Sequence, residues 1–130
     1  MRGAYLDASA LVKLAVTEPE TAALRKYLRR HPQRFTNRVA EVEVRRAVRR
    51  LPMSREAPVQ AAFDGVTVID LDPSIANRAG VIEPVALRSL DAIHLASALE
   101  LGDELDAFVT YDARQATAAR ELGLPVASPA

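Results

Sequence analysis

Short apolar runs alternate with helical segments along the 130 residues of this chain, and this alternation most constrains how it can fold. The apolar and β-branched runs predict strands at residues 4–6, 33–36, 66–69, 107–110 and 124–126. Helical spacing of apolar residues predicts helices at 9–16, 20–30, 38–51, 59–64, from 73 onward, 90–101 and 113–122. Because buried strands joined by helices pair in parallel, we predict an α/β fold: a three-layer α/β/α sandwich with a central, mainly parallel β-sheet.

Residues that favour helix ends mark the limits of these segments. Asn37 is expected to cap the helix at 38–51, and Pro52 to end it. Residues 52–58 are then expected to form a loop. Ser89 is expected to cap the helix at 90–101, and Gly123 to stop the last helix.

The composition is that of an ordinary folded protein, with 49% hydrophobic and 26% charged residues. The length predicts a single domain over residues 1–130. The absence of cysteine excludes disulfides and thiolate metal sites. No apolar stretch approaches the roughly 18 residues that span a bilayer, and the N-terminus runs into a strand without a signal peptide. We therefore expect a cytoplasmic location and no membrane partner.

The net charge is zero, so overall charge does not indicate nucleic-acid binding. Arginine nevertheless supplies 15 of the 17 basic residues, and many of them lie between residues 25 and 55. A guanidinium group can bind two phosphate oxygens at once, which makes arginine the better phosphate ligand. A general preference for arginine over lysine would explain the same bias without any function.

Two acidic residues follow apolar runs that are far apart in the sequence. Asp7 ends the run at 4–6, and Asp112 ends the run at 108–111. Parallel sheets bind ligands at the carboxyl ends of their strands, so we expect these two acids to lie near each other. A lone carboxylate in apolar surroundings is costly, whereas convergent carboxylates can bind Mg²⁺ or Mn²⁺. Such an ion promotes phosphoryl chemistry, and the pattern therefore indicates a metal-dependent nuclease.

Two further acids lie on predicted helices. Glu43 lies at the edge of the apolar face of the helix at 38–51, where it could be a metal ligand, and Arg46 and Arg50 share its side and could hold phosphate groups. The alternative is a solvated Glu–Arg pair. Asp91 lies in the first turn of an almost wholly apolar helix, where the helix dipole favours its charged, metal-binding form. The alternative is that Asp91 only caps the helix.

Three polar residues near these acids could orient them. His94 lies one turn after Asp91, and we expect it to be packed or to hold a metal ligand rather than to act as a general base. Ser9 and Thr110 each lie two residues from an acid, and their hydroxyls could orient carboxylates or bound water. Helix capping by Ser9 and strand propensity at Thr110 are the alternatives.

Four segments in this order resemble a PIN domain of the VapC-type toxin ribonucleases. They are residues 5–14 (YLDASALVKL), 42–47 (VEVRRA), 89–96 (SLDAIHLA) and 109–112 (VTYD), and the ending at 122–126 (LGLPV) is also similar. The resemblance implies that Asp7, Glu43, Asp91 and Asp112 form the catalytic, metal-binding site. It also implies a parallel sheet between helices, an RNA substrate, a homodimer and inhibition by a cognate antitoxin.

The expected function is that of a metal-dependent endoribonuclease, the toxin of a toxin–antitoxin pair, which hydrolyses RNA phosphodiester bonds with one or two Mg²⁺ or Mn²⁺ ions. The alternatives are a non-catalytic PIN-like module that binds RNA or protein, and a DNA-directed nuclease. A phosphoacceptor receiver domain is disfavoured because it needs a late lysine, and the only lysines are Lys13 and Lys26. The sequence departs from the family pattern at Asn37, where serine is usual, at Gln115, where a large apolar residue is common, and in its short segment at 52–66.

Overall fold

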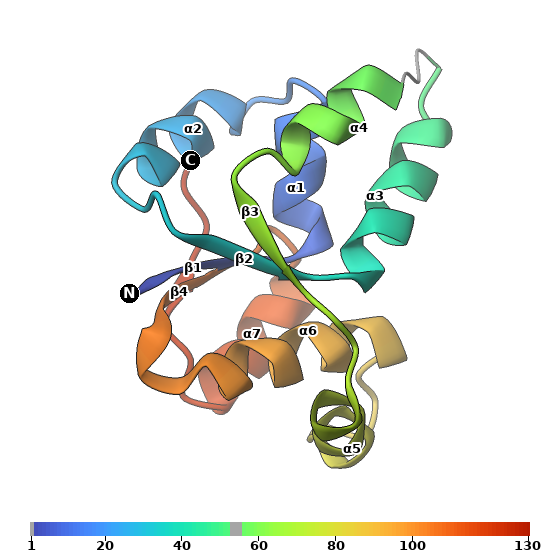
Figure 1. Cartoon of the computed structure of the whole chain (residues 1–130), viewed down its shortest axis with the longest axis vertical. Coiled ribbons are helices and arrows are strands. Elements are labelled where there is room, and N and C mark those ends of the chain that lie inside the picture. Colours follow the sequence, from blue (N-terminus) through green and yellow to red (C-terminus); the bar gives the residue numbers. More distant parts are fainter. Residues whose placement is uncertain (1, 53–55) are drawn as a thin grey trace.

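All five strands of the computed structural model, which describes residues 2–52 and 56–130, lie in one parallel sheet (Figure 1). The strands follow the order β3-β2-β1-β4-β5. Their bounds are β1 Gly3–Leu6, β2 Arg34–Asn37, β3 Val66–Ile69, β4 Leu105–Val109 and β5 Val126–Ala127. This confirms the predicted α/β class, and every strand pair is parallel.

Helices cover both faces of the sheet, as the three-layer prediction requires (Figure 1). One layer contains α1 Ala8–Ala15, α2 Thr21–Arg29, α3 Val39–Arg49 and α4 Glu56–Ala62. The other contains α5 Pro73–Val81, α6 Ser89–Leu101 and α7 Ala113–Glu121, with a short 3₁₀ helix at Gly102–Glu104. This division follows the strand order, because α1 to α4 lie in the connections from β1 through β2 to β3, whereas α5 to α7 lie in the connections from β3 through β4 to β5. Within the described residues, none of the helices combines the length and apolarity needed to cross a membrane.

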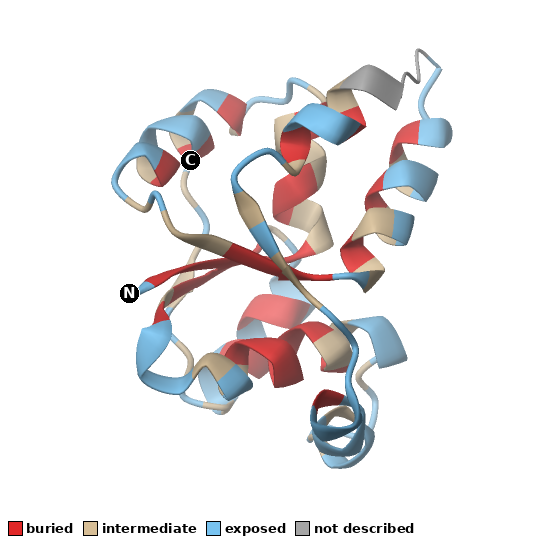
Figure 2. Ribbon diagram, viewed as in Figure 1, coloured by how far each residue is buried: buried red, intermediate tan, exposed pale blue. Residues whose placement is uncertain are grey.

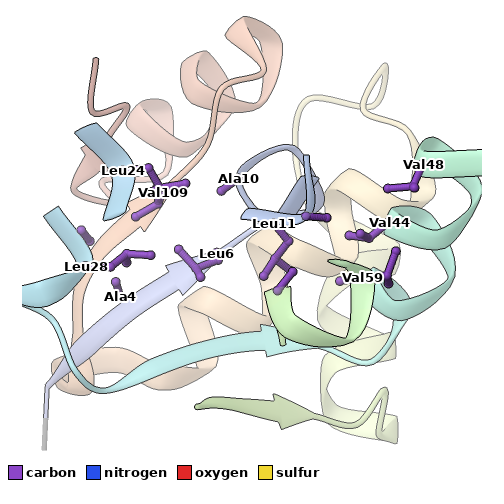
Figure 3. Close-up of a cluster of buried hydrophobic side chains, with 14 residues drawn as sticks. Ala4, Leu6, Ala10, Leu11, Leu24, Leu28, Val44, Val48, Val59 and Val109 are labelled. Atoms are coloured by element: carbon purple, nitrogen blue, oxygen red, sulfur yellow. The ribbon is translucent and has the colours of Figure 1, made fainter. Parts of the chain in front are cut away.

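Two buried clusters hold the layers together, one on each face of the sheet. Ala4 and Leu6 of β1 pack with α1–α4, in the cluster drawn in Figure 3, whereas Tyr5 packs with α6 and α7 on the opposite face. This alternation follows from the two-residue period of a strand. Figure 2 shows the result, with a buried sheet and helices that are exposed on their outer sides.

Two predicted helix caps and one predicted loop differ from the structure. The N-cap position of α3 is Arg38 rather than Asn37, although Asn37 Oδ1 still accepts a hydrogen bond from Val39 N at 3.1 Å. Ser89 is the first residue of α6 and does not cap it, since Arg88 holds the N-cap position. The predicted loop at 52–58 is too long, because α4 begins at Glu56; proline is tolerated in a first helical turn, so Pro58 does not prevent it. Residues 53–55 of that predicted loop lie outside the described residues.

The strand order places a crevice where the acids were expected. β1 pairs with β2 on one side and with β4 on the other, so the chain reverses its winding direction between β1 and β4. In such sheets, ligands bind outside the carboxyl ends of the strands at this reversal. Asp7 directly follows β1, and Asp112 lies three residues after β4.

Gly3 allows β1 to approach the segment before β2 closely. A Cβ atom at Gly3 would lie 2.3 Å from the backbone oxygen of Gln33, which accepts a hydrogen bond from Ala4 N. We expect Gly3→Ala to lower the free energy of unfolding by about 1–3 kcal/mol, as overpacking does. Gly80, inside α5, is the matched control because nothing lies within 4 Å of its added Cβ. Gly80→Ala should raise the free energy of unfolding by about 0.5–1 kcal/mol. Urea unfolding measures both values, and equal effects of the two substitutions would contradict this account.

Candidate functional site

Asp7 is a buried carboxylate held by donors from two separate segments. It is only 4% exposed and caps α1 by accepting a hydrogen bond from Ala10 N at 3.1 Å. Ser9 Oγ donates to its Oδ1 at 2.6 Å, and Thr110 Oγ1 donates to its Oδ2 at 2.5 Å. Burial raises the pKa of Asp7, and the nearby His94 and these hydrogen bonds lower it in part. The carboxylate is therefore kept in one orientation at the carboxyl end of β1.

The same two hydroxyls connect Asp7 to the turn between β4 and α7. Ser9 Oγ accepts a hydrogen bond from Tyr111 N at 2.8 Å, and Thr110 Oγ1 accepts one from Asp112 N at 3.1 Å. Asp112 is exposed and caps α7, with Oδ1 accepting from Arg114 N at 2.9 Å. Asp7 and Asp112 thus lie at the same edge of the sheet, joined through the Thr110 hydroxyl. Asp7 caps α1, so the alternative that Ser9 caps this helix is wrong.

Glu43 is held at the site by a hydrogen bond with the buried His94. Its Oε1 lies 2.6 Å from His94 Nε2, while His94 Nδ1 lies 2.7 Å from the hydroxyl of Tyr5. Burial raises the pKa of Tyr5 far above the physiological range, so the phenol stays protonated and can donate to Nδ1. In the tautomer with the proton on Nε2, His94 accepts from Tyr5 and donates to Glu43. His94, at 1% exposure, is packed and bonded to a carboxylate, as expected for this position.

Asp91 is half-buried in the first turn of α6, as predicted. Burial raises its pKa most, followed by the nearby negative charge of Asp112; Glu43 adds to this effect, while His94 and Arg88 oppose it. Asp91 therefore lies within electrostatic range of two of the other acids. His94 also lowers the pKa of Asp7, so three of the four predicted acids, Asp7, Glu43 and Asp91, interact with this one imidazole ring. The fourth, Asp112, acts on Asp91.

The donor chemistry of this group suits a hard divalent cation. All four side chains offer carboxylate oxygens, which favour Mg²⁺ and Mn²⁺ over softer metals. Within residues 2–52 and 56–130, neither the carboxylate of Asp91 nor the Oε2 atom of Glu43 accepts a hydrogen bond, so these oxygens are available to a cation. In the same part of the chain, no three acidic or histidine side chains yet converge as a coordination sphere. Rotation of the more exposed acids toward Asp7 would be needed to complete one.

Arg46 and Arg50 lie on the exposed side of α3. Together with Arg45, Arg49, Glu41 and Val42 they line an open hollow of about 770 Å³. None of the four acids lines this hollow, so the two arginines lie beside the acidic group rather than within it. Glu41, which also lies on α3, pairs with Arg38 at 3.0 Å.

Sequence reasoning missed three kinds of residue around the acids. In the sequence Tyr5 is only one member of an apolar run, whereas in the structure its hydroxyl forms a hydrogen bond with His94. Gln115 Nε2 donates to the backbone oxygen of Asp91 at 3.3 Å and so joins α7 to α6, whereas Gln115 was noted only as a departure from a pattern. Arg88 and Arg114 lie beside Asp91, and their positions close to Asp91 and Asp112 in the sequence were the available signal.

Comparisons with known proteins agree with this arrangement. A model of the PIN domain matches residues 4–121. The chain is 45% identical over 130 residues to ribonuclease VapC46 of Mycobacterium tuberculosis, and the alignment covers 99% of each protein.

Solved structures share the fold. The structure of Mycobacterium tuberculosis VapC20, a Sarcin-Ricin loop cleaving toxin, has a TM-score of 0.72 at 16% identity, covering 89% of this chain and 95% of that one. A toxin–antitoxin complex from Klebsiella pneumoniae also gives 0.72, at 22% identity and 98% coverage of both chains. The match to the PIN model and the 45% identity to VapC46 over the full length of the chain show the family as well as the fold. The chain belongs to the PIN-domain family and, within it, to the VapC ribonuclease toxins of toxin–antitoxin systems.

Proposed function

We propose that Asp7, Glu43, Asp91 and Asp112 bind Mg²⁺ or Mn²⁺ and form the site at which this ribonuclease hydrolyses RNA phosphodiester bonds. The observation that carries the proposal is that Asp7 and Asp112 follow the carboxyl ends of β1 and β4, while Asp7, Glu43 and Asp91 interact with His94 and Asp91 also interacts with Asp112. PIN nucleases are typically metal-dependent, which supports a cation at these oxygens.

Each side chain has a distinct task in the proposed site. Asp7, held by Ser9 and Thr110, is the rigid ligand; Asp91 and Asp112 are more exposed and can adjust to the substrate. When bound, the cation supplies an activated water and neutralises charge on the scissile phosphate. His94 orients Glu43 through its Nε2–H. Arg46 and Arg50, exposed on α3, hold the RNA backbone as it approaches.

The partners follow from the family. We propose a cytoplasmic homodimer that is inhibited by a cognate antitoxin, and the toxin–antitoxin complex from Klebsiella pneumoniae, which shares this fold, supports the second part. A protein that binds the metal but cleaves no RNA across a broad panel would instead be a non-catalytic PIN-like module. Cleavage of DNA in place of RNA would identify a DNA-directed nuclease.

Loss of one proposed metal ligand should remove most of the activity. We expect Asp7→Asn, Glu43→Gln or Asp91→Asn to lower the rate of RNA cleavage by more than about 100-fold, because each removes a charged ligand from a site that stabilises the transition state. A chelator should have the same effect on the unmodified protein. Glu41→Gln, on the same helix as Glu43 but paired with Arg38 at the surface, is the control and should retain activity. Full activity of Asp7→Asn or Asp91→Asn would refute the assigned roles.

Tyr5 should act on catalysis through His94. In Tyr5→Phe, His94 Nδ1 loses its donor, so the proton is no longer kept on Nε2 and Glu43 is held less firmly. We expect kcat to fall about 10-fold with little change in KM, as for other residues that orient a metal ligand. ¹⁵N NMR of the imidazole should show protonated Nε2 in the wild type and mixed tautomers in the variant.

The control for this substitution is Tyr27→Phe. Tyr27 stacks on His31 at 4.4 Å between ring centroids, but it lies on α2 away from the acids, so neither kcat nor the His94 signals should change. Unchanged His94 tautomers in Tyr5→Phe would show that the hydroxyl does not control Glu43.

The metal-free protein should be destabilised by the Asp91 charge. Because the pKa of Asp91 is raised in the folded state, its contribution to stability is present below the ordinary value of about 3.9 and is lost as pH rises through the folded value. Metal-free Asp91→Asn should therefore have a higher Tm than the wild type at pH 7, and the difference should shrink at low pH. Added Mn²⁺ should raise the Tm of the wild type alone. A Tm difference that is independent of pH would contradict this electrostatic explanation.

A further inference from the structure

A small pocket lies beside Asp91, between residues 84–88 and α7. Its volume is about 220 Å³, and Pro84, Leu87 and Ala118 provide apolar walls. Asp91 belongs both to this pocket and to the acidic group. Anything bound in the pocket therefore lies next to the proposed metal site.

Two cations flank this pocket from different segments. Arg88 precedes α6 and Arg114 lies in the first turn of α7, and both side chains line the pocket. Within the described residues, neither guanidinium forms an ion pair. Asp91 and Glu121 also line the pocket, and Arg88 acts on the charge of Asp91 without pairing with it. Guanidinium groups beside apolar walls match a flat-sided ligand that carries phosphates, because a guanidinium can stack on such a ligand or bind its phosphate oxygens.

The pocket differs in kind from the hollow on α3. The hollow is larger and open, and its arginines lie around only one apolar side chain, Val42, so it suits contacts with phosphates alone. The pocket near Asp91 is smaller and has apolar walls. Proteins bind single-stranded RNA by combining basic surfaces along the backbone with apolar or aromatic surfaces for unstacked bases. The two sites correspond to these two functions.

Building on the proposed ribonuclease function, we propose that this pocket receives one unstacked base of the RNA next to the scissile phosphate, while Arg88 and Arg114 contact the flanking phosphates. Thr117 and Glu121 on α7 complete the lining with a hydroxyl and a carboxylate, which can bond the polar edge of a base. A basic side chain of a protein partner gains no net attraction here, because the two arginines offset the two carboxylates of the lining.

The test compares RNA with and without bases, under conditions that prevent cleavage. Fluorescence anisotropy measures binding of uridine, adenosine, cytidine and guanosine oligoribonucleotides in the presence of chelator, and of an abasic ribose–phosphate chain of equal length. We expect the wild type to bind at least one of the base-containing RNAs about 10-fold more tightly than the abasic chain. Thr117→Phe and Ala86→Trp fill the pocket from opposite walls and should both bring this ratio close to one.

Arginine variants separate base binding from phosphate binding. Arg114→Ala should weaken binding of all RNAs, including the abasic chain, and reduce the salt dependence while retaining the preference for bases. Arg120→Ala, on the same helix but outside the pocket, is the control and should change neither property.

Several results would overturn the proposal. It fails if the wild type shows no preference for base-containing RNA, or if folded Thr117→Phe and Ala86→Trp retain that preference. It also fails if both variants bind RNA normally but lose binding to the cognate antitoxin. Failure of the proposed function is distinguishable, because it appears as absence of RNA cleavage by the wild type with Mg²⁺ or Mn²⁺, whatever the binding measurements show.

Discussion

The buried carboxylate of Asp7 is the constraint on which the site depends. A charge with 4% exposure is tolerated because Ser9, Thr110 and the backbone of Ala10 all donate to it. Two of these donors also receive hydrogen bonds from the turn after β4, so the network that stabilises Asp7 also positions Asp112. The same hydrogen bonds therefore stabilise the charge of Asp7 and assemble this part of the site.

A second network holds the opposite side of the site. Tyr5 lies on β1, two residues before Asp7, and its side chain packs with α6 rather than with α1. Its hydroxyl sets the donor direction of His94, which in turn holds Glu43 of α3. One short strand thus contributes to both networks, because successive residues point to opposite faces of the sheet. The cost is electrostatic: Asp91 carries a raised pKa among acids that a cation would neutralise.

Much of this arrangement could be predicted from local sequence, and the part that could not has a clear reason. The positions of Asp7 and Asp112 were predictable because an acid that ends a buried strand lies at the ligand-binding edge whatever the strand order. The first-turn position of Asp91 followed from the start of an almost wholly apolar helical segment. The helix caps were less reliable: Ser89 and Asn37 are both good capping residues, but Asn37 Nδ2 also donates to Ser97, a contact that depends on the packing of α6 against β2.

The sequence by itself determined a parallel α/β chain with acids at the ends of its strands, because strand and helix periods and the residues that follow them are local properties. Only the tertiary structure decided the strand order, the link from Tyr5 through His94 to Glu43, and the pocket shared by Arg88, Arg114 and Asp91. These features join segments separated by dozens of residues. Their formation depends on which helices pack on which face of the sheet, and no local pattern encodes that choice.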